Sequence, residues 1–239
     1  MGRPYRPKAN KEVRRVIIQK QKDFEKIKAF LEGYSKVFIV GCADCATTCK
    51  TGGEEELAEM KGRLESIGKT VTGTAVFDTA CLLGEVRRKC EENHAAIEAA
   101  DAVLVLACGS GVQAIGDHLE SKPVVPGVDA LFIGEAIRAG KYEEKCQACG
   151  ECILDLTDGI CPLTRCAKGL LNGPCGGYKD GKCEVDPDKE CAWLLIYKRL
   201  KERGHLDKIR QIQGAKDYSK HHRPRRLVWD RPQKAKERK

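Results

Sequence analysis

Short apolar runs and longer amphipathic stretches alternate along the first 140 residues. Apolar runs of strand length occupy 36–41, 70–77, 101–107 and 123–126. Side chains spaced as on one face of a helix occupy 53–68, 83–99 and 112–119. The run at 101–107 is apolar after its first residue, as in strands that are buried on both faces. Regular alternation of strand and helix is typical of a parallel sheet covered by helices, so we predict a small parallel α/β domain.

The pattern changes on either side of this domain. Residues 11–33 carry apolar side chains at helical spacing, which predicts an amphipathic helix that ends near Gly33. Between residues 146 and 191 the periodicity disappears, and cysteine and glycine replace the apolar residues that a core would need. Such a segment needs a metal or a covalent staple to fold. Trp193, Ile196 and Leu200 then predict one more amphipathic helix.

These patterns divide the chain into four parts. The parts are a basic N-terminal arm with its helix (1–35), a Rossmann-like α/β domain (36–140), a compact cysteine-rich, metal-stapled module (141–200), and a basic C-terminal helix and tail (201–239). The few residues 141–145 are expected to be the connection between the two cysteine-bearing parts.

Charge follows the same division. Residues 1–36 hold 11 basic and 4 acidic side chains (+7), residues 198–239 hold 16 and 5 (+11), and the residues between them hold 16 and 26 (−10). The basic ends predict solvated tails or docking on an acidic partner. Nucleic acid is a less favoured partner, because the aromatic side chains that stack on single strands make up only 5% of the chain. No apolar run reaches about 18 residues and no signal peptide opens the sequence, so we expect a cytoplasmic protein without a membrane span.

Fourteen cysteines in a reducing compartment predict metal or redox chemistry rather than disulfides. The first group follows the strand ends: Cys42, Cys45 and Cys49 after the first strand, Cys81 after the second, and Cys108 after the third. The carboxyl ends of parallel strands meet at one edge of a sheet. We therefore predict that Cys42, Cys45, Cys49 and Cys108 bind one [4Fe–4S] cluster, with Cys81 as a substitute ligand or a neighbouring thiol. The alternative is that these cysteines are small buried hydrophobes.

The second group lies in the segment without periodicity. Its members are Cys146, Cys149, Cys152, Cys161, Cys166, Cys175, Cys183 and Cys191. Eight thiolates make two sets of four, and no histidine lies among them, so any metal site here has sulfur ligands only. The C-x2-C-x2-C triple followed by Cys-Pro is similar to bacterial ferredoxins, although the last spacing is eight residues instead of three. Soft thiolate sites select iron–sulfur clusters or zinc, so we predict two clusters, one cluster with one zinc, or two structural zinc sites.

Gly109 and Gly111 open the helix that follows Cys108. With Ala114 they fit a loose form of the phosphate-binding pattern GxGxxA. That pattern normally follows the first strand of a nucleotide-binding unit, whereas this one follows the third. The alternative, a tight turn that lets Cys108 reach a cluster and directs backbone N–H groups toward the sulfurs, fits the position better.

Two stretches of the sequence resemble a known family. The run GICPLTRCAKGLLNGPCGG (159–177), continued by GKCEV (181–185) and CAW (191–193), resembles the methylenetetrahydrofolate reductase C-terminal domain family. The runs GCADCATTCKTGGE (41–54) and ACGSGVQ (107–113) are similar to the MetV-like small subunits of two-subunit methylenetetrahydrofolate reductases. The resemblance covers about residues 36–200 and leaves out the basic ends.

This resemblance implies an iron–sulfur electron-transfer subunit with two or three [4Fe–4S] clusters. Its partners would be an electron-donor protein and a flavin-containing MetF-type TIM barrel, on which methylenetetrahydrofolate is reduced to methyltetrahydrofolate. The flavin would belong to the partner, because three or four predicted strands cannot form the eight-stranded barrel. Two alternatives remain at this point: a zinc-stapled interaction protein, and an iron–sulfur subunit of another flavin- or corrinoid-dependent methyl-transfer system.

Overall fold

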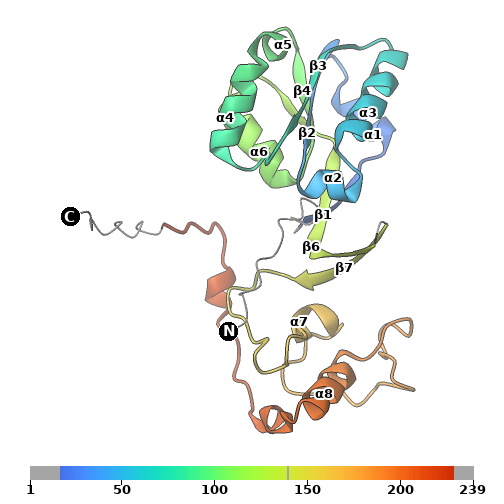
Figure 1. Cartoon of the computed structure of the whole chain (residues 1–239), viewed down its shortest axis with the longest axis vertical. Helices are drawn as coiled ribbons and strands as arrows, with labels where there is room; N and C mark the ends of the chain where they lie inside the picture. The colour runs from blue at the N-terminus through green and yellow to red at the C-terminus, as the bar shows by residue number, and fades with distance from the viewer. Residues whose placement is uncertain (1–16, 139, 229–239) are drawn as a thin grey trace, which may run out of the picture. The chain divides into compact units, whose positions relative to one another are not determined.

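The computed structural model describes residues 17–138 and 140–228 and divides into two compact units (Figure 1). Unit 1 is Met1–Lys145 and unit 2 is Cys146–Lys239. The basic N-terminal arm up to residue 16, the first part of the predicted helix 11–33 and the tail 229–239 lie outside the described residues.

Unit 1 is built on a four-stranded parallel sheet in the order β3-β2-β4-β5. Its strands are β2 (Lys36–Cys42), β3 (Thr70–Phe77), β4 (Ala102–Leu106) and β5 (Val124–Pro126). The helices between them are α2 (Cys45–Cys49), α3 (Glu54–Ser66), α4 (Leu83–Glu92), α5 (His94–Glu98) and α6 (Gly109–His118). The predicted α/β fold is therefore confirmed, including the short edge strand β5.

Helices cover both faces of this sheet, and each face has its own apolar core. Along β2, Phe38 and Val40 pack in one core and Val37 and Ile39 in the other, because successive side chains of a strand point to opposite faces. In Figure 1, α4, α5 and α6 lie on one side of the sheet, and α3 and α1 (Phe24–Phe30) lie on the other. A central strand buried on both faces explains why β2 and β4 are nearly continuous apolar runs.

The predicted helix 11–33 is wrong over its middle. Residues Ile17–Gln21 form strand β1, and only Phe24–Phe30 form a helix, α1. Strand β1 pairs antiparallel with β6 (Val128–Arg138), a partner more than 100 residues away. This pairing buries Ile18. The helical spacing of apolar residues was thus overruled by a tertiary contact, which local periodicity does not report.

Two smaller differences concern helix ends. The predicted helix 83–99 is divided at Asn93 into α4 and α5, and the Asn93 side-chain amide donates to the carbonyl of Lys89 at 2.9 Å. A side chain that hydrogen-bonds the backbone in this way competes with continuation of a helix. The helix predicted from residue 112 begins at Gly109, directly after Cys108.

A second sheet, in the order β1-β6-β7, is absent from the prediction. Strand β7 (Lys141–Cys146) occupies the residues that were expected to be a short connection. Most residues of β6 and β7 are exposed or half-buried, and the sequence of β7 is mainly charged. Such strands show neither a continuous apolar run nor a clear alternation, so periodicity does not distinguish them from a loop.

Unit 2 has little regular structure among its described residues. Its elements are α7 (Pro162–Arg165), α8 (Ala192–Glu202) and two 3-10 turns, η1 (Leu206–Arg210) and η2 (Tyr218–His221). Helix α8 confirms the amphipathic helix predicted from Trp193, Ile196 and Leu200, which pack with Ile160 and Cys191 in a small core. No helix in the described part of the chain is long and apolar enough to cross a membrane.

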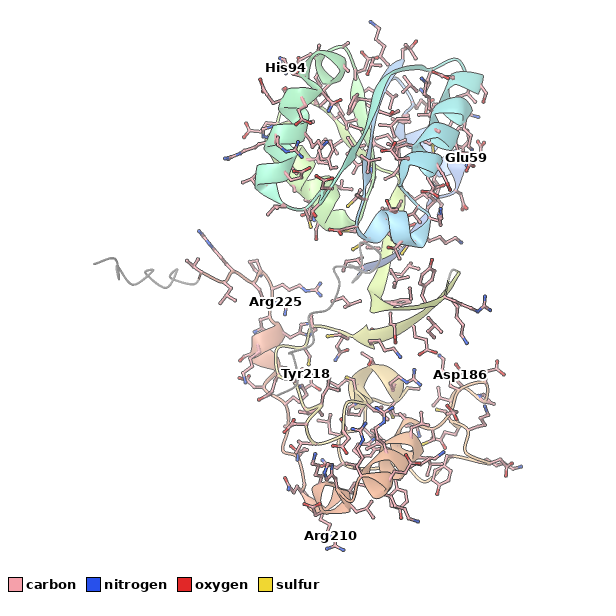
Figure 2. The ribbon with its side chains drawn as sticks, viewed as in Figure 1. Glu59, His94, Asp186, Arg210, Tyr218 and Arg225 are labelled. Carbon is pink, nitrogen blue, oxygen red and sulfur yellow. The ribbon has the colours of Figure 1, made fainter. Side chains whose placement is uncertain are left out.

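Most described residues of the basic C-terminal segment are exposed, and several of them contact the rest of unit 2 as far as residue 225. Lys216 is only 8% exposed, and its ammonium group donates to the carbonyl of Glu151. Figure 2 labels Tyr218 and Arg225 on the same segment. The contacts of Lys220 and Arg225, described below, also go to the cysteine-rich part of unit 2.

Candidate metal centres

The five cysteines of the first group lie at the carboxyl edge of the parallel sheet. Cys42 ends β2, Cys45 and Cys49 are the first and last residues of α2, and Cys108 is the residue before α6. Cys81 lies in the turn between β3 and α4 and is exposed. Three separate loops therefore bring thiols to one edge, because each loop follows a strand that runs in the same direction.

Charge interactions connect four of these thiols. Burial raises the pKa of Cys81, and the negative charges of Cys108 and Cys45 raise it further. Burial also raises the pKa of Cys42 despite backbone N–H groups that donate to its sulfur, and the charges of Asp44 and Cys45 add to this effect. Mutual repulsion of this kind arises only between groups that lie close together. The four thiols Cys42, Cys45, Cys81 and Cys108 therefore form one network, which we call the edge site.

Cys49 has a different environment. It is buried at the end of α2, and its thiol lies 3.8 Å from the carbonyl oxygen of Ile17 in β1, to which it donates. Helix α2 packs against β1 along this contact. Cys81, which the sequence suggested only as a substitute, shares the charge network of three predicted ligands. The C-x2-C-x3-C spacing contains no signal for this difference, because it depends on where β1 lies.

Two helices begin at the edge site. Cys108 is the N-cap of α6, and Leu82, the residue after Cys81, is the N-cap of α4; neither helix has a side-chain cap. The first N–H groups of a helix and its dipole favour negative charge, so these helices would stabilise thiolates. A Cβ atom at Gly111 would meet those of Ala107 at 3.1 Å and Ala80 at 3.2 Å, whereas Gly109 faces open space. The absent side chain at Gly111 thus lets α6 approach the loop that carries Cys81.

The loops of the edge site also carry charged side chains, among them Asp44 and Asp78. Asp44, between Cys42 and Cys45, accepts a hydrogen bond from the Thr79 hydroxyl at 2.8 Å. This bond joins the loop after β2 to the loop after β3. Sequence reasoning overlooked Asp44, since a single aspartate between cysteines has no distinctive spacing.

Four cysteines of the second group line one cavity in unit 2. The cavity is partly open to solvent, with ≈ 330 Å³ of empty space, and its wall includes Cys166, Cys175, Cys183 and Cys191. These residues come from four separate positions in the chain, which brings together the last four cysteines of the sequence. We call this set the pocket site.

Hydrogen bonds converge on the pocket site. Backbone N–H groups of Val185 and Asp186, with a further one from Ala167, lower the pKa of Cys183. The Cys175 thiol lies 3.6 Å from the Glu184 carboxylate, which also pairs with Lys168 on the cavity wall. Backbone N–H groups directed at a sulfur stabilise its thiolate form, the form that binds metals.

The remaining cysteines of this group are those of the C-x2-C-x2-C loop, Cys146, Cys149 and Cys152, and Cys161 after it. Within the loop, the N–H of Ala148 donates to the sulfur of Cys146 at 3.3 Å, and the Cys149 thiol donates to the Glu151 carbonyl at 3.4 Å. Cys161 lies further along the chain as the N-cap of α7. We call residues 146–152 the cysteine loop.

The described residues contain no three cysteine, histidine or carboxylate side chains that already surround a single ion position. The edge and pocket sites nevertheless satisfy what a metal–thiolate centre requires of its surroundings: four thiols on one edge or one cavity wall, N–H groups directed at sulfur, and helix N-termini nearby.

A charge cluster fixes the loop between Cys152 and Cys161. The carboxylate of Asp158, only 6% exposed, accepts hydrogen bonds from Lys208 and His205, each at 2.8 Å. Lys208 also donates to the carbonyl of Asp155 at 2.7 Å. These bonds tie the loop to η1, which follows α8. Sequence reasoning did not find them, because the partners lie about 50 residues apart.

Acid is expected to weaken this cluster. Hydrogen bonds from Lys208, which has the larger effect, and from His205 hold the pKa of Asp158 below its ordinary value. A lowered pKa stabilises the fold above the ordinary value of about 3.9 and loses that contribution as the pH falls through the lowered one. Asp158→Asn, which tolerates the residue's φ of 47°, should lower the melting temperature at pH 7, and its effect should disappear as the pH falls through the lowered pKa of Asp158. Thermal unfolding of both proteins followed by circular dichroism over this pH range would show a constant difference if the charge were unimportant.

Comparison with known proteins identifies part of the chain. No curated protein and no solved structure matches it. Residues 125–219 match the family described as "Methylene-tetrahydrofolate reductase C terminal". This range contains all eight cysteines of the second group and begins in the last strand of the parallel sheet. The runs 41–54 and 107–113, which are similar to MetV-like small subunits, lie outside the matched residues, so that finer resemblance stays a prediction. The resemblance of 159–193 is confirmed, and the segment 125–219 belongs to the methylene-tetrahydrofolate reductase C-terminal family.

Proposed function

We propose that this chain is an iron–sulfur electron-transfer subunit of a methylenetetrahydrofolate reductase complex. It would pass electrons between a donor protein and the flavin of a MetF-type catalytic subunit. The observation that carries the proposal is the gathering of thiols at two places, the edge site in unit 1 and the pocket site in unit 2. The family match supports the biochemical context.

Each proposed ligand set has a distinct position in the fold. We assign Cys42, Cys45, Cys81 and Cys108 to one [4Fe–4S] cluster at the edge site. The second cluster takes its ligands from Cys146, Cys149, Cys152 and Cys161, whose spacing is similar to that of ferredoxins. When bound, such a cluster supplies one-electron oxidation and reduction. The chain's own part would be to fix the thiolates and to direct N–H groups at their sulfurs.

The pocket site has two candidate occupants, a third cluster and a zinc ion. Four cysteines from separate positions with N–H groups at Cys183 would suit a closed, four-coordinate zinc site, which is structural in most proteins. In either case its thiolates would join the ends of the segment 166–191, which has few apolar residues of its own. The pocket site would therefore hold unit 2 together whether or not it carries electrons.

The reduction of the folate carbon is assigned to the partner. The described part of the chain has one four-stranded parallel sheet and one three-stranded sheet, and a flavin-binding TIM barrel needs eight parallel strands. Electrons from this chain would then reach the substrate only through the partner's flavin, so we expect no folate reduction by the chain alone.

The test is to purify the full chain without oxygen and to measure its spectrum and its iron, sulfide and zinc content. We expect broad visible absorption that dithionite bleaches, and equal amounts of iron and sulfide. The dithionite-reduced chain, freed of excess dithionite, should then reduce the flavin of a purified MetF-type subunit in a stopped-flow experiment. A colourless protein that contains zinc only would contradict the proposal and favour a structural zinc protein.

A further inference from the structure

A basic segment of unit 2 contacts the cysteine loop at several points. Residues 208–225 contain Lys208, Lys216, Lys220 and Arg225, and we call this segment the strap. The ammonium group of Lys216 donates to the carbonyl of Glu151, and that of Lys220 lies 3.0 Å from the Glu151 carboxylate. The other oxygen of this carboxylate accepts the backbone N–H of Asp217 at 3.2 Å.

The contact continues along the backbone of the loop. Arg225 donates to the carbonyl of Ala148 at 3.0 Å, so strap cations contact the loop on both sides of Cys149. A Cβ atom at Gly150 would lie 3.0 Å from the Cβ of Lys220 and 3.1 Å from its carbonyl oxygen. Gly150 also has a φ of 82°, which disfavours other residues. The loop and the strap are therefore packed against each other without room for a side chain between them.

Two lysines of the strap differ, because Lys220 forms an exposed ion pair with Glu151 whereas Lys216 is buried. Lys216 is 8% exposed and its hydrogen-bond partner is a backbone carbonyl, and the nearby Glu151 carboxylate offsets part of its positive charge. Burying a lysine is costly unless other charges repay the cost. In the loop, the thiolate forms of Cys146, Cys149 and Cys152 would supply negative charge. The strap cations thus lie beside the backbone of the loop that would carry these thiolates.

We propose that the strap is an electrostatic clamp that retains the metal centre of the cysteine loop and raises its reduction potential. This inference rests on the proposed function, because it requires a centre bound by the loop. Positive charge beside a cluster favours its reduced, more negative form, and fixed loop geometry slows the loss of metal. Lys216 and Lys220 are positioning residues in this view, since they act through the loop and not on an electron carrier directly.

The clamp is tested in the full chain with Lys216→Met and Lys220→Gln. Two readouts are measured in each protein: the midpoint potential of each centre, by a redox titration followed with electron paramagnetic resonance, and the rate at which a chelator removes iron. We expect both variants to shift one centre to a more negative potential and to lose its iron several-fold faster. Lys220→Arg, which keeps the charge, should behave like the wild type, and so should Lys198→Gln, a change at an exposed lysine of α8.

If the strap had only a structural role, the variants would lose iron faster but keep the midpoint potential of the wild type. If the potentials of Lys220→Gln and the wild type agree, the electrostatic clamp is wrong, even where iron is lost faster. Lys220 is 44% exposed, so its replacement is mild enough to leave the fold intact should Lys216→Met unfold the unit. Cys149→Ser separates this result from a failure of the proposed function: unchanged iron content and unchanged resonance signals would mean that the loop binds no centre.

Discussion

Chelation of bound metal is expected to unfold unit 2 and to leave the sheet of unit 1 folded. The reason is the distribution of buried apolar side chains. Unit 1 has two cores, one on each face of its sheet, that include Phe38, Phe77, Leu57 and Leu104. The buried core of unit 2 consists of Ile160, Cys191, Trp193, Ile196 and Leu200, and one of these is a proposed ligand. So small a core does not balance the conformational entropy of the described residues of unit 2.

The metal centres would supply the missing stabilisation. Structural zinc contributes about 10–16 kcal/mol to the folding of small zinc domains, which exceeds the net stability of most domains. The edge site differs, because its thiols lie on loops of a sheet that is already stabilised by its own cores. Loss of a cluster there is expected to disturb the loops after β2, β3 and β4 more than the strands.

The measurement is limited proteolysis of the full chain before and after treatment with a strong chelator under anaerobic conditions. Mass spectrometry should find a protected fragment that ends near Lys145, while the sequence from Cys146 onward is degraded. Protein treated in parallel with chelator already saturated with metal is the control. Equal protection of both units after metal removal would show that unit 2 folds by apolar burial alone and would contradict the metal-stapled module.

The parallel sheet could be predicted because each of its strands and helices is recognisable from the hydrophobic pattern of its own segment. Strands β2 and β4 are buried on both faces and appear as apolar runs, and β3 and the helix α3 follow at the spacing that a crossover connection needs. The same topology placed Cys42, Cys81 and Cys108 at one edge, since they follow parallel strands. These predictions needed no knowledge of which distant segments pack together.

The sheet β1-β6-β7 and the strap could not be predicted for the opposite reason. Strand β1 is stabilised by pairing with β6, and Lys216 by a carbonyl 65 residues away. Such contacts have no local signature in hydrophobic spacing, and a basic segment looks alike in a tail and in a strap. The error at β1 also affected the site, because the thiol of Cys49 donates to the backbone of that strand.

Cys81→Ser is expected to remove the cluster of the edge site, whereas Cys49→Ser should retain it. Cys81 shares a charge network with Cys108 and Cys45, and Cys49 is directed at the carbonyl of Ile17. Serine is close in size to cysteine but its hydroxyl is a poor ligand for iron, so the change acts on coordination more than on packing. Iron and sulfide content per chain should fall by about one cluster's share in Cys81→Ser.

Cys90→Ser is the matched control for these two variants. Cys90 is a buried thiol of α4 that packs in the apolar core, and burial raises its pKa to about 11, as expected for a cysteine that stays protonated. Its replacement should lower the stability of unit 1 through the buried hydroxyl and leave the iron content unchanged. Loss of iron in Cys49→Ser with full retention in Cys81→Ser would restore the ligand set Cys42, Cys45, Cys49 and Cys108 that the spacing alone predicts. Cys49 and Cys81 both lie in unit 1. A comparison of their serine variants therefore separates the loss of a ligand from a loss of folding, and it does not depend on whether unit 2 is folded.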